Sequence, residues 1–212
     1  MKKILSVVFT ILTVFCSLFS GCDKKRDLSA LITELRSDVF MGTSGDVVVN
    51  CNYGFSRDLD GKNYLTFSLK NKESSLTTYK IVLEKDKTYL ETFTLCPVTH
   101  KLTAKIQIDD FCEKEFEVKI LFGSESVSIV MKSLLPENTI TYKDALNCLY
   151  KNQPTLVDGY FSEAGVFNAK LTVRVSVRKE KAYYFIAFKT DKVTALLIDG
   201  KTGEVLAVRD VY

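Results

Sequence analysis

The 212-residue chain contains no tryptophan and a single histidine, His100. One histidine excludes a metal site built from several histidine ligands. The absence of tryptophan removes the residue that marks the core of true immunoglobulin domains. With three prolines, ten glycines and no low-complexity stretch, the chain is predicted to be globular rather than disordered.

The chain also lacks a large net charge once the N-terminal segment is left out of the count. Residues 1–21 hold two lysines and no acid, so 27 of the 29 basic residues remain against 26 acidic ones. Nucleic-acid binding needs a clustered basic surface. The balance therefore argues against a nucleic-acid partner, and also against strong electrostatic steering of a charged partner.

The N-terminus carries a long apolar run. Two lysines precede residues 4–19, which contain no charge, and the small residues Ser20 and Gly21 follow. A positive start, an apolar middle and a small-residue end predict a signal peptide over residues 1–21. An uncleaved anchor is the alternative, although the run is short for a span that needs ~20 residues.

Residues 18–22 resemble the lipobox of bacterial lipoproteins. Ser20 and Gly21 match the small residues before the cysteine, and Phe19 stands where an aliphatic residue is commoner. The resemblance implies lipid attachment to Cys22 and cleavage before it. It places the protein at the outer face of a bacterial membrane, where several acyl chains, at ~0.8 kcal/mol per CH₂, would anchor it firmly.

Residues 22–27 are predicted to form a short tether. Its basic residues Lys24, Lys25 and Arg26 lie where lipid headgroups would be, each worth on the order of 1 kcal/mol with anionic lipid. A solvated tether is the simpler interpretation of this modest cluster. The five residues between Cys22 and the next apolar pattern reach at most ~20 Å, so the folded body is expected close to the membrane.

The first element after the tether has helical spacing. Apolar residues recur at i, i+3, i+4 and i+7, and they are Leu28, Leu31, Ile32, Leu35 and Val39. This pattern predicts an amphipathic helix, which Gly42 and Gly45 would end.

Period-two alternation follows from residue 46 to 132. Turn signals such as Asp60-Gly61 separate seven predicted strands, which start near Val47, Leu65, Tyr79, Tyr89, Leu102, Phe116 and Val127. Seven short strands predict an antiparallel β-sandwich or barrel, and an immunoglobulin-like sandwich fits the count. With the preceding helix, they make up the first expected domain, residues 28–135.

The remaining chain predicts a small α+β domain over residues 139–212. Thr141, with Asp144 three residues later, forms a variant capping box at the start of a short helix that ends before Pro154. Residues 167–178 alternate cleanly, which predicts a strand with one face toward a core and the other toward water. Hairpins complete the domain.

A segment near the C-terminus, residues 197–206, reads LIDGKTGEVL and resembles the end of the PepSY domain family. The resemblance extends from Thr139 to Tyr212 and includes an Ala-Leu pair on the helix, Ala145 and Leu146. It implies an antiparallel sheet with a packed helix, acting through a binding surface without catalytic residues. Such domains occur in secreted and membrane-anchored bacterial proteins and are associated with restraining peptidases. The same turn also suits unrelated hairpins, because glycine readily adopts positive φ.

Chemistry-bearing motifs are scarce. Cys96 and His100 have a ligand-like spacing, but a structural zinc needs two more ligands and only Cys112 is near, so a polar turn is the simpler interpretation. Residues 58–63 lack the acid ladder of a calcium loop, and an Asp-Gly hairpin explains them. Phosphate loops, dinucleotide fingerprints and nucleophile elbows are absent. We expect no metal, no cofactor and no enzymatic activity.

Four cysteines follow the lipidation site: Cys51, Cys96, Cys112 and Cys148. An exported protein can form disulfides, and four cysteines allow three full pairings that sequence cannot distinguish. Each cysteine can equally be a small buried apolar residue.

Four aromatic residues, Tyr183, Tyr184, Phe185 and Phe188, occupy both faces of one predicted strand. Core packing explains one face, and the other is a candidate partner surface because tyrosine is enriched in binding hot spots. We therefore expect a non-catalytic lipoprotein that binds a protein or peptide. A binder of small ligands or cell-wall glycan is the alternative, and the oligomeric state stays open.

Overall fold

The computed structural model describes residues 26–70, 78–97 and 99–211; the predicted leader and Cys22 lie outside these residues. Three helical segments occur in the described part: the 3-10 helix η1 (Leu28–Leu31), α2 (Tyr142–Asn152) and α3 (Pro154–Asp158). Its strands are β1 (Ile32–Ser44), β2 (Val47–Ser56), β3 (Asn63–Lys70), β4 (Tyr79–Glu84), β5 (Thr88–Thr92), β6 (Thr94–Leu95), β7 (Leu102–Gln107), β8 (Glu115–Phe122), β9 (Glu125–Ser133), β10 (Lys170–Arg178), β11 (Lys181–Lys189), β12 (Val193–Asp199) and β13 (Val205–Val211).

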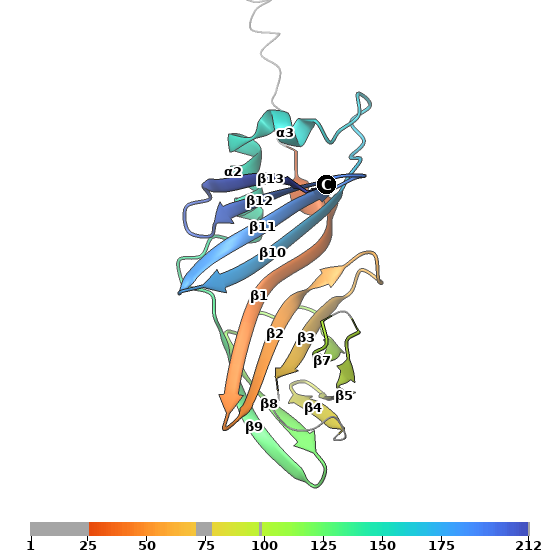
Figure 1. The fold of residues 1–212 in the computed structure, drawn as a ribbon, viewed down its shortest axis with the longest axis vertical. Coiled ribbons are helices and arrows are strands. Elements are labelled where there is room, and N and C mark those ends of the chain that lie inside the picture. Colours follow the sequence, from red (N-terminus) through yellow and green to blue (C-terminus); the bar gives the residue numbers. More distant parts are fainter. Residues whose placement is uncertain (1–25, 71–77, 98, 212) are drawn as a thin grey trace, which may run out of the picture.

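The first nine strands curl into a nearly closed antiparallel sheet (Figure 1). One arm runs from β1 through β2 and β3 to β7, and the other runs from β1 through β9 and β8 to β4 and β5. The arms approach each other again where β5 lies beside β7. This confirms the mainly β, antiparallel architecture that the alternation predicts, while the immunoglobulin-like arrangement stays a prediction.

Two details of the predicted strands are wrong. The expected strand from Tyr89 to Cys96 is divided into β5 and β6 at Phe93, whose buried side chain points inward and whose N–H donates to the Tyr79 carbonyl at 2.9 Å. The expected strand over residues 167–178 begins at Lys170.

The predicted helix over residues 28–39 is also wrong. Only η1 is helical there, and Ile32 starts the 13-residue strand β1. The register of β1 shifts twice, between Ile32 and Glu34 and between Arg36 and Asp38. Each irregularity adds a residue to the strand and breaks its period of two. Buried side chains therefore fall at Ile32 and Leu35, three residues apart, which imitates helical spacing.

β1 belongs to two parts of the molecule. Its first half pairs in parallel with β10, with Ile32 opposite Leu171 and Arg36 opposite Arg174. Its second half pairs antiparallel with β9 at Phe40 and Met41. Because both partners use the same side of β1, they separate between residues 36 and 40, while β2 follows the other side throughout.

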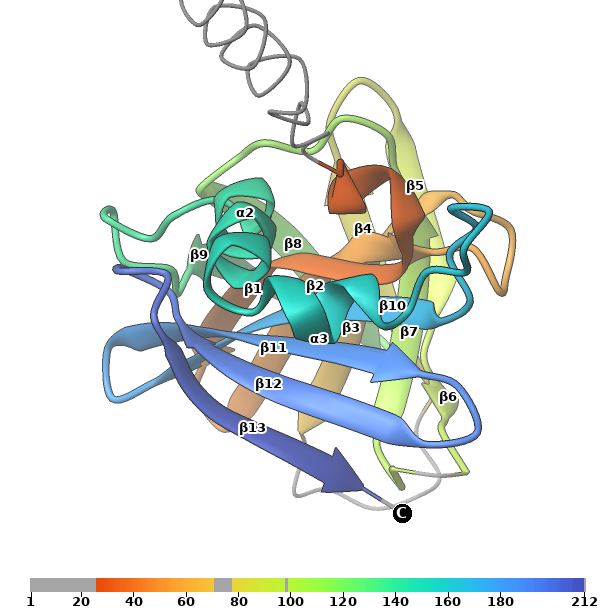
Figure 2. The same ribbon diagram turned by 90° about the horizontal axis from the view of Figure 1, so that it is seen from above.

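β10 to β13 form antiparallel hairpins in sequence order, with α2 and α3 packed on one face (Figure 2). α2 begins as predicted, because the Thr141 hydroxyl accepts the Asp144 N–H at 3.2 Å. Its buried residues are Ala145, Leu146 and Leu149. They pack into a second core that also includes Ile32 and Leu35 of β1, separate from the core inside the nearly closed sheet.

The turn between β12 and β13 packs against α2. The Asp199 carboxylate accepts hydrogen bonds from the N–H groups of Lys201 and Thr202, both at 2.8 Å, and these bonds lower the pKa of Asp199. Gly203 has φ of 74°, and a β-carbon there would lie 2.5 Å from the Cys148 sulfur on α2. Glycine is therefore required here both for the backbone conformation and for the close approach.

Candidate functional site

The four aromatic residues of the candidate partner surface divide between the faces of β11. Tyr184 and Phe188 belong to the core. The Tyr184 hydroxyl donates a 2.6 Å hydrogen bond to the Ile140 carbonyl, and the Phe188 ring stacks on Tyr160 with centroids 4.5 Å apart. The accessible part of the predicted surface therefore consists of the other two residues.

Tyr183 and Phe185 alternate with the core residues Tyr184 and Phe188 along β11, so their side chains point to the opposite face. The helices α2 and α3 lie on the core side of this sheet (Figures 1 and 2). Phe185 is 38% exposed and pairs with Leu197 of β12, which pairs with Ala207 of β13. We call this uncovered side of β10 to β13, which also carries Arg174, the open face. Its apolar residues form a row that reaches the edge of the sheet.

β13 is that edge. Among the described strands it pairs only with β12, so one side of its seven-residue backbone meets no neighbouring strand. Leu206 and Val208 are 45% and 47% exposed on it. An unblocked edge with apolar side chains offers N–H and C=O groups to an added strand.

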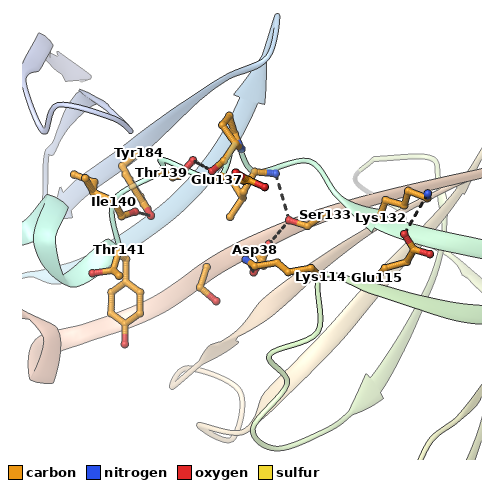
Figure 3. A pocket seen from close by; sticks show the side chains of 14 residues that line it. Asp38, Lys114, Glu115, Lys132, Ser133, Glu137, Thr139, Ile140, Thr141 and Tyr184 are labelled. Carbon is orange, nitrogen blue, oxygen red and sulfur yellow. Dashed lines mark hydrogen bonds and ion pairs between the residues drawn. The ribbon is translucent and has the colours of Figure 1, made fainter.

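A cavity of about 560 Å³ opens where β9 and β10 separate along β1 (Figure 3). We call it the junction cavity. Its walls come from β1, from the region of β8 and β9, from the linker before α2 and from β11. It is lined by Ser37, Asp38, Lys114, Glu115, Lys132, Ser133, Leu135, Pro136, Glu137, Thr139, Ile140, Thr141, Tyr142 and Tyr184. Its volume is in the range of small-molecule sites.

Several polar groups of the junction cavity already interact with each other. Asp38 accepts a hydrogen bond from the Ser133 hydroxyl at 3.0 Å, and its other oxygen lies 3.7 Å from the Lys114 ammonium. Lys132 and Glu115 form an ion pair at 3.2 Å across the rim. Burial raises the pKa of the Tyr184 phenol, and the nearby charge of Asp38 raises it further. These hydroxyl, carboxylate and ammonium groups are hydrogen-bonding partners that a polar ligand in the cavity could use.

The other chemistry-bearing residues occupy turns. His100 has φ of 52°, and its N–H donates to the Cys96 carbonyl at 2.9 Å. The Asp60 carboxylate accepts the Lys62 N–H at 3.0 Å and the Tyr64 hydroxyl, as a hairpin turn requires. The described residues contain no group of three or more His, Cys, Asp or Glu side chains that could hold a metal.

Three of the cysteines carry free thiols in different surroundings. Cys51 is fully buried inside the nearly closed sheet, and this burial raises the pKa of its thiol. Cys148 is half-buried against Gly203, and Cys112 is exposed. For Cys51, the interpretation as a small buried apolar residue therefore holds.

Comparison of the chain with protein-family models, with curated proteins and with solved structures finds no match. Among the described residues, no helix has the length and apolar character needed to cross a bilayer. The function is therefore inferred from the open face, the edge strand and the junction cavity, because a fold alone does not specify function.

The sequence pattern reveals neither the junction cavity nor the position of Arg174 next to Arg36 of β1. The junction cavity depends on where β9 and β10 part, and the proximity of Arg36 to Arg174 depends on the parallel pairing of β1 with β10. The alternation in residues 167–178 does place Arg174 on the water-facing side. No local signal links it to Arg36, which lies within the segment predicted as a helix.

Proposed function

We propose that this protein is a membrane-anchored, non-catalytic binding module of the bacterial cell envelope that holds an extended segment of a partner protein. The observation that carries the proposal is the edge strand β13, which has no second described neighbour and exposes Leu206 and Val208. Extended peptides add to such edges through backbone hydrogen bonds, and alternate side chains supply specificity. The resemblance to PepSY domains makes an extracellular peptidase the first partner class to test.

The open face supports the same proposal. A segment added beside β13 would continue the sheet, and its side chains on that side would extend the apolar row of Phe185, Leu197 and Ala207. Aromatic residues on an uncovered face supply contact area with little loss of side-chain entropy. Tyr183 and Phe185 are therefore the side chains that we assign to partner recognition.

The position of Arg26 supports anchoring near α3. Its Nε lies 3.3 Å from an Asp158 oxygen, and its guanidinium carbon lies 3.8 Å above the centre of the Phe161 ring. Cys22 precedes it by four residues, which span at most about 14 Å when extended. A lipid on Cys22 would therefore hold the α3 end of the molecule toward the bilayer.

The test is a cross-linked pull-down of the lipidated protein from native membranes. The variant Val208→Lys places a charge on the edge strand, and Val130→Lys is its matched control, because Val130 is 44% exposed on β9. We expect a specific partner with the wild type and Val130→Lys, and its loss with Val208→Lys. Retention of the partner by Val208→Lys contradicts the proposal.

Two further controls complete the design. Cys22→Ala should abolish incorporation of labelled palmitate and leave residues 1–21 uncleaved, and labelling that persists in this variant contradicts lipid attachment to Cys22. Analytical ultracentrifugation checks whether β13 pairs with a second copy of the chain instead. If the wild type and Val130→Lys are dimers and Val208→Lys is a monomer, β13 pairs with a second copy of the chain and not with a different protein.

A second candidate function is binding of a small polar ligand or cell-wall glycan in the junction cavity. Six hydroxyl-bearing side chains line it, beside the apolar surfaces of Leu135, Pro136 and Ile140. This combination suits a sugar, which needs both hydrogen-bond partners and apolar contact. NMR titration with soluble peptidoglycan fragments tests it, with Ser37→Phe to fill the cavity. Shifts around the cavity that Ser37→Phe abolishes would favour this function.

A further inference from the structure

The half-buried Arg174 and Glu34 form a cluster with the exposed Arg36 beside the open face. Arg174 of β10 donates from Nε and Nη2 to the two carboxylate oxygens of Glu34, at 3.1 and 2.8 Å. The Nε of Arg36 lies 3.4 Å from the same Glu34 Oε1. One carboxylate therefore faces two guanidinium groups, and the cluster retains a positive charge.

The cluster borders a second cavity, of about 390 Å³, over β1, β2, β3 and β7. The open face continues onto these strands, because Phe185 pairs with Arg174, and Arg174 with Arg36. Three basic residues line this cavity, Arg36, Lys101 and Lys105, against one acid, Glu34. The ion pairs among the described residues include neither lysine. The near-neutral charge of the whole chain thus conceals a local positive excess.

Arg36 is the least compensated charge of the cluster, because only its Nε contacts Glu34, at 3.4 Å, whereas Arg174 makes two shorter bonds to the same carboxylate. Burial lowers the pKa of its guanidinium, the charge of Arg174 lowers it further, and Glu34 opposes both effects. A lowered arginine pKa means that the charged form is less stabilised here than in water. An anion entering the cavity would restore the missing compensation.

We infer that this second cavity is an anion site that binds a phosphate group, with Arg36 as its direct ligand and Arg174 beside it. A guanidinium presents its N–H donors in a planar fork that matches phosphate oxygens. A phosphate monoester carries roughly −1.5 to −2 charges near neutral pH, which fits the excess of basic over acidic lining residues better than a single carboxylate does. The half-buried ring of Tyr64 and the exposed Leu59 give the organic part of the ligand an apolar wall.

The inference is independent of β13 and of the proposed peptide partner, because it rests on other strands. Its test is isothermal titration calorimetry of phenyl phosphate into the purified full chain with Cys22→Ala in mild detergent, at low ionic strength. Arg36→Gln should weaken binding at least tenfold. Arg178→Gln is the matched control, since Arg178 is an exposed arginine of the same strand as Arg174 and should leave the affinity unchanged.

Lys105→Gln is the second variant, because the Lys105 side chain is exposed and forms none of the described ion pairs, so we expect its replacement to leave the fold unchanged. We expect a loss of affinity of a few fold and a weaker dependence of binding on salt. Absence of binding to the wild type overturns the inference. So does an equal loss with Arg178→Gln and Arg36→Gln, because that result reports only general surface charge.

The phosphate can come from a soluble metabolite or from a lipid headgroup, and a second ligand distinguishes them. Dihexanoyl phosphatidic acid, a water-soluble phospholipid whose headgroup is a phosphate monoester, is titrated below its micelle concentration into the same variants. Binding of phenyl phosphate alone supports a soluble phosphomonoester. If the phospholipid binds to the wild type and not to Arg36→Gln, the natural ligand is a lipid headgroup. If neither probe depends on Arg36, the phosphate site is excluded.

Discussion

Gly54 of β2 lies directly against the backbone of Leu35 in β1, so closely that a β-carbon on Gly54 would overlap the Leu35 carbonyl oxygen. The contact occurs beside the irregularity between Arg36 and Asp38, where β1 gains a residue relative to β2. The irregularity bends β1 from one core toward the other. Gly54 is thus the position at which β2 makes room for that bend.

We expect Gly54→Ala to lower the free energy of unfolding by about 2 kcal/mol or more, because the backbone of β1 has to move away from the new methyl group. Asn52→Ala, on the same strand two residues away, should change it by less than about 0.5 kcal/mol. Urea unfolding monitored by circular dichroism measures both. Equal stability of the two variants would mean that β1 and β2 adjust freely.

The effect of replacing an aromatic residue of β11 on the free energy of unfolding should depend on the face of the strand that carries it. Phe188→Ala removes a fully buried ring that stacks on Tyr160, and a loss of about 3–5 kcal/mol is expected. Phe185→Ala removes a 38% exposed ring, and a loss below about 1 kcal/mol is expected. Denaturant midpoints with unchanged slopes check the difference. A large loss with Phe185→Ala would place it in a packed layer instead of a partner surface.

Asp199 should make the stability that the turn between β12 and β13 contributes depend on pH. Hydrogen bonds from Thr202 and Lys201 lower its pKa in the folded protein, so its contribution to stability is present above the unfolded pKa, near 3.9, and declines as pH falls through the folded value. Asp199→Ala should cost about 1 kcal/mol at pH 7. Asp199→Asn keeps a neutral acceptor and should flatten the decline below pH 4. Thermal melts between pH 2 and 7 test both, and parallel curves for wild type and Asp199→Asn would refute the assignment.

The free thiols should react in the order of their exposure. The thiolate is the reactive form, and burial both shields Cys51 and raises its pKa. We expect Cys112 to react with a thiol reagent within minutes in the folded protein, and Cys51 to react only after unfolding. Mass spectrometry of peptides after timed labelling identifies each site. Early labelling of Cys51 would show that the nearly closed sheet opens readily.

The sequence predicts most of the strands and the α2 cap because these depend on local pattern. Thr141 and Asp144 are three residues apart, and their interaction is the one expected. Strand alternation identifies the two faces of β11, although it cannot tell which face α2 and α3 cover. The exposure of Phe185 and the burial of Phe188 are decided by that packing.

β1 could not be predicted, because its pattern reflects partners far away in the chain. Ile32 and Leu35 enter one core and Phe40 the other, and two irregularities between them hide the period of two. The cluster of Glu34 with Arg174 joins residues 140 positions apart, a separation that no local pattern encodes. The junction cavity is a product of the same long-range pairing.

The parallel pairing of β1 with β10 also has a consequence for the order of folding. The nearly closed sheet contains only strands that end by Ser133, whereas the partner of Ile32 is Leu171. Closing so long a loop is slow relative to forming hairpins. During synthesis, the first half of β1 therefore keeps an open edge until β10 has been made, and an unpaired strand edge is prone to aggregation.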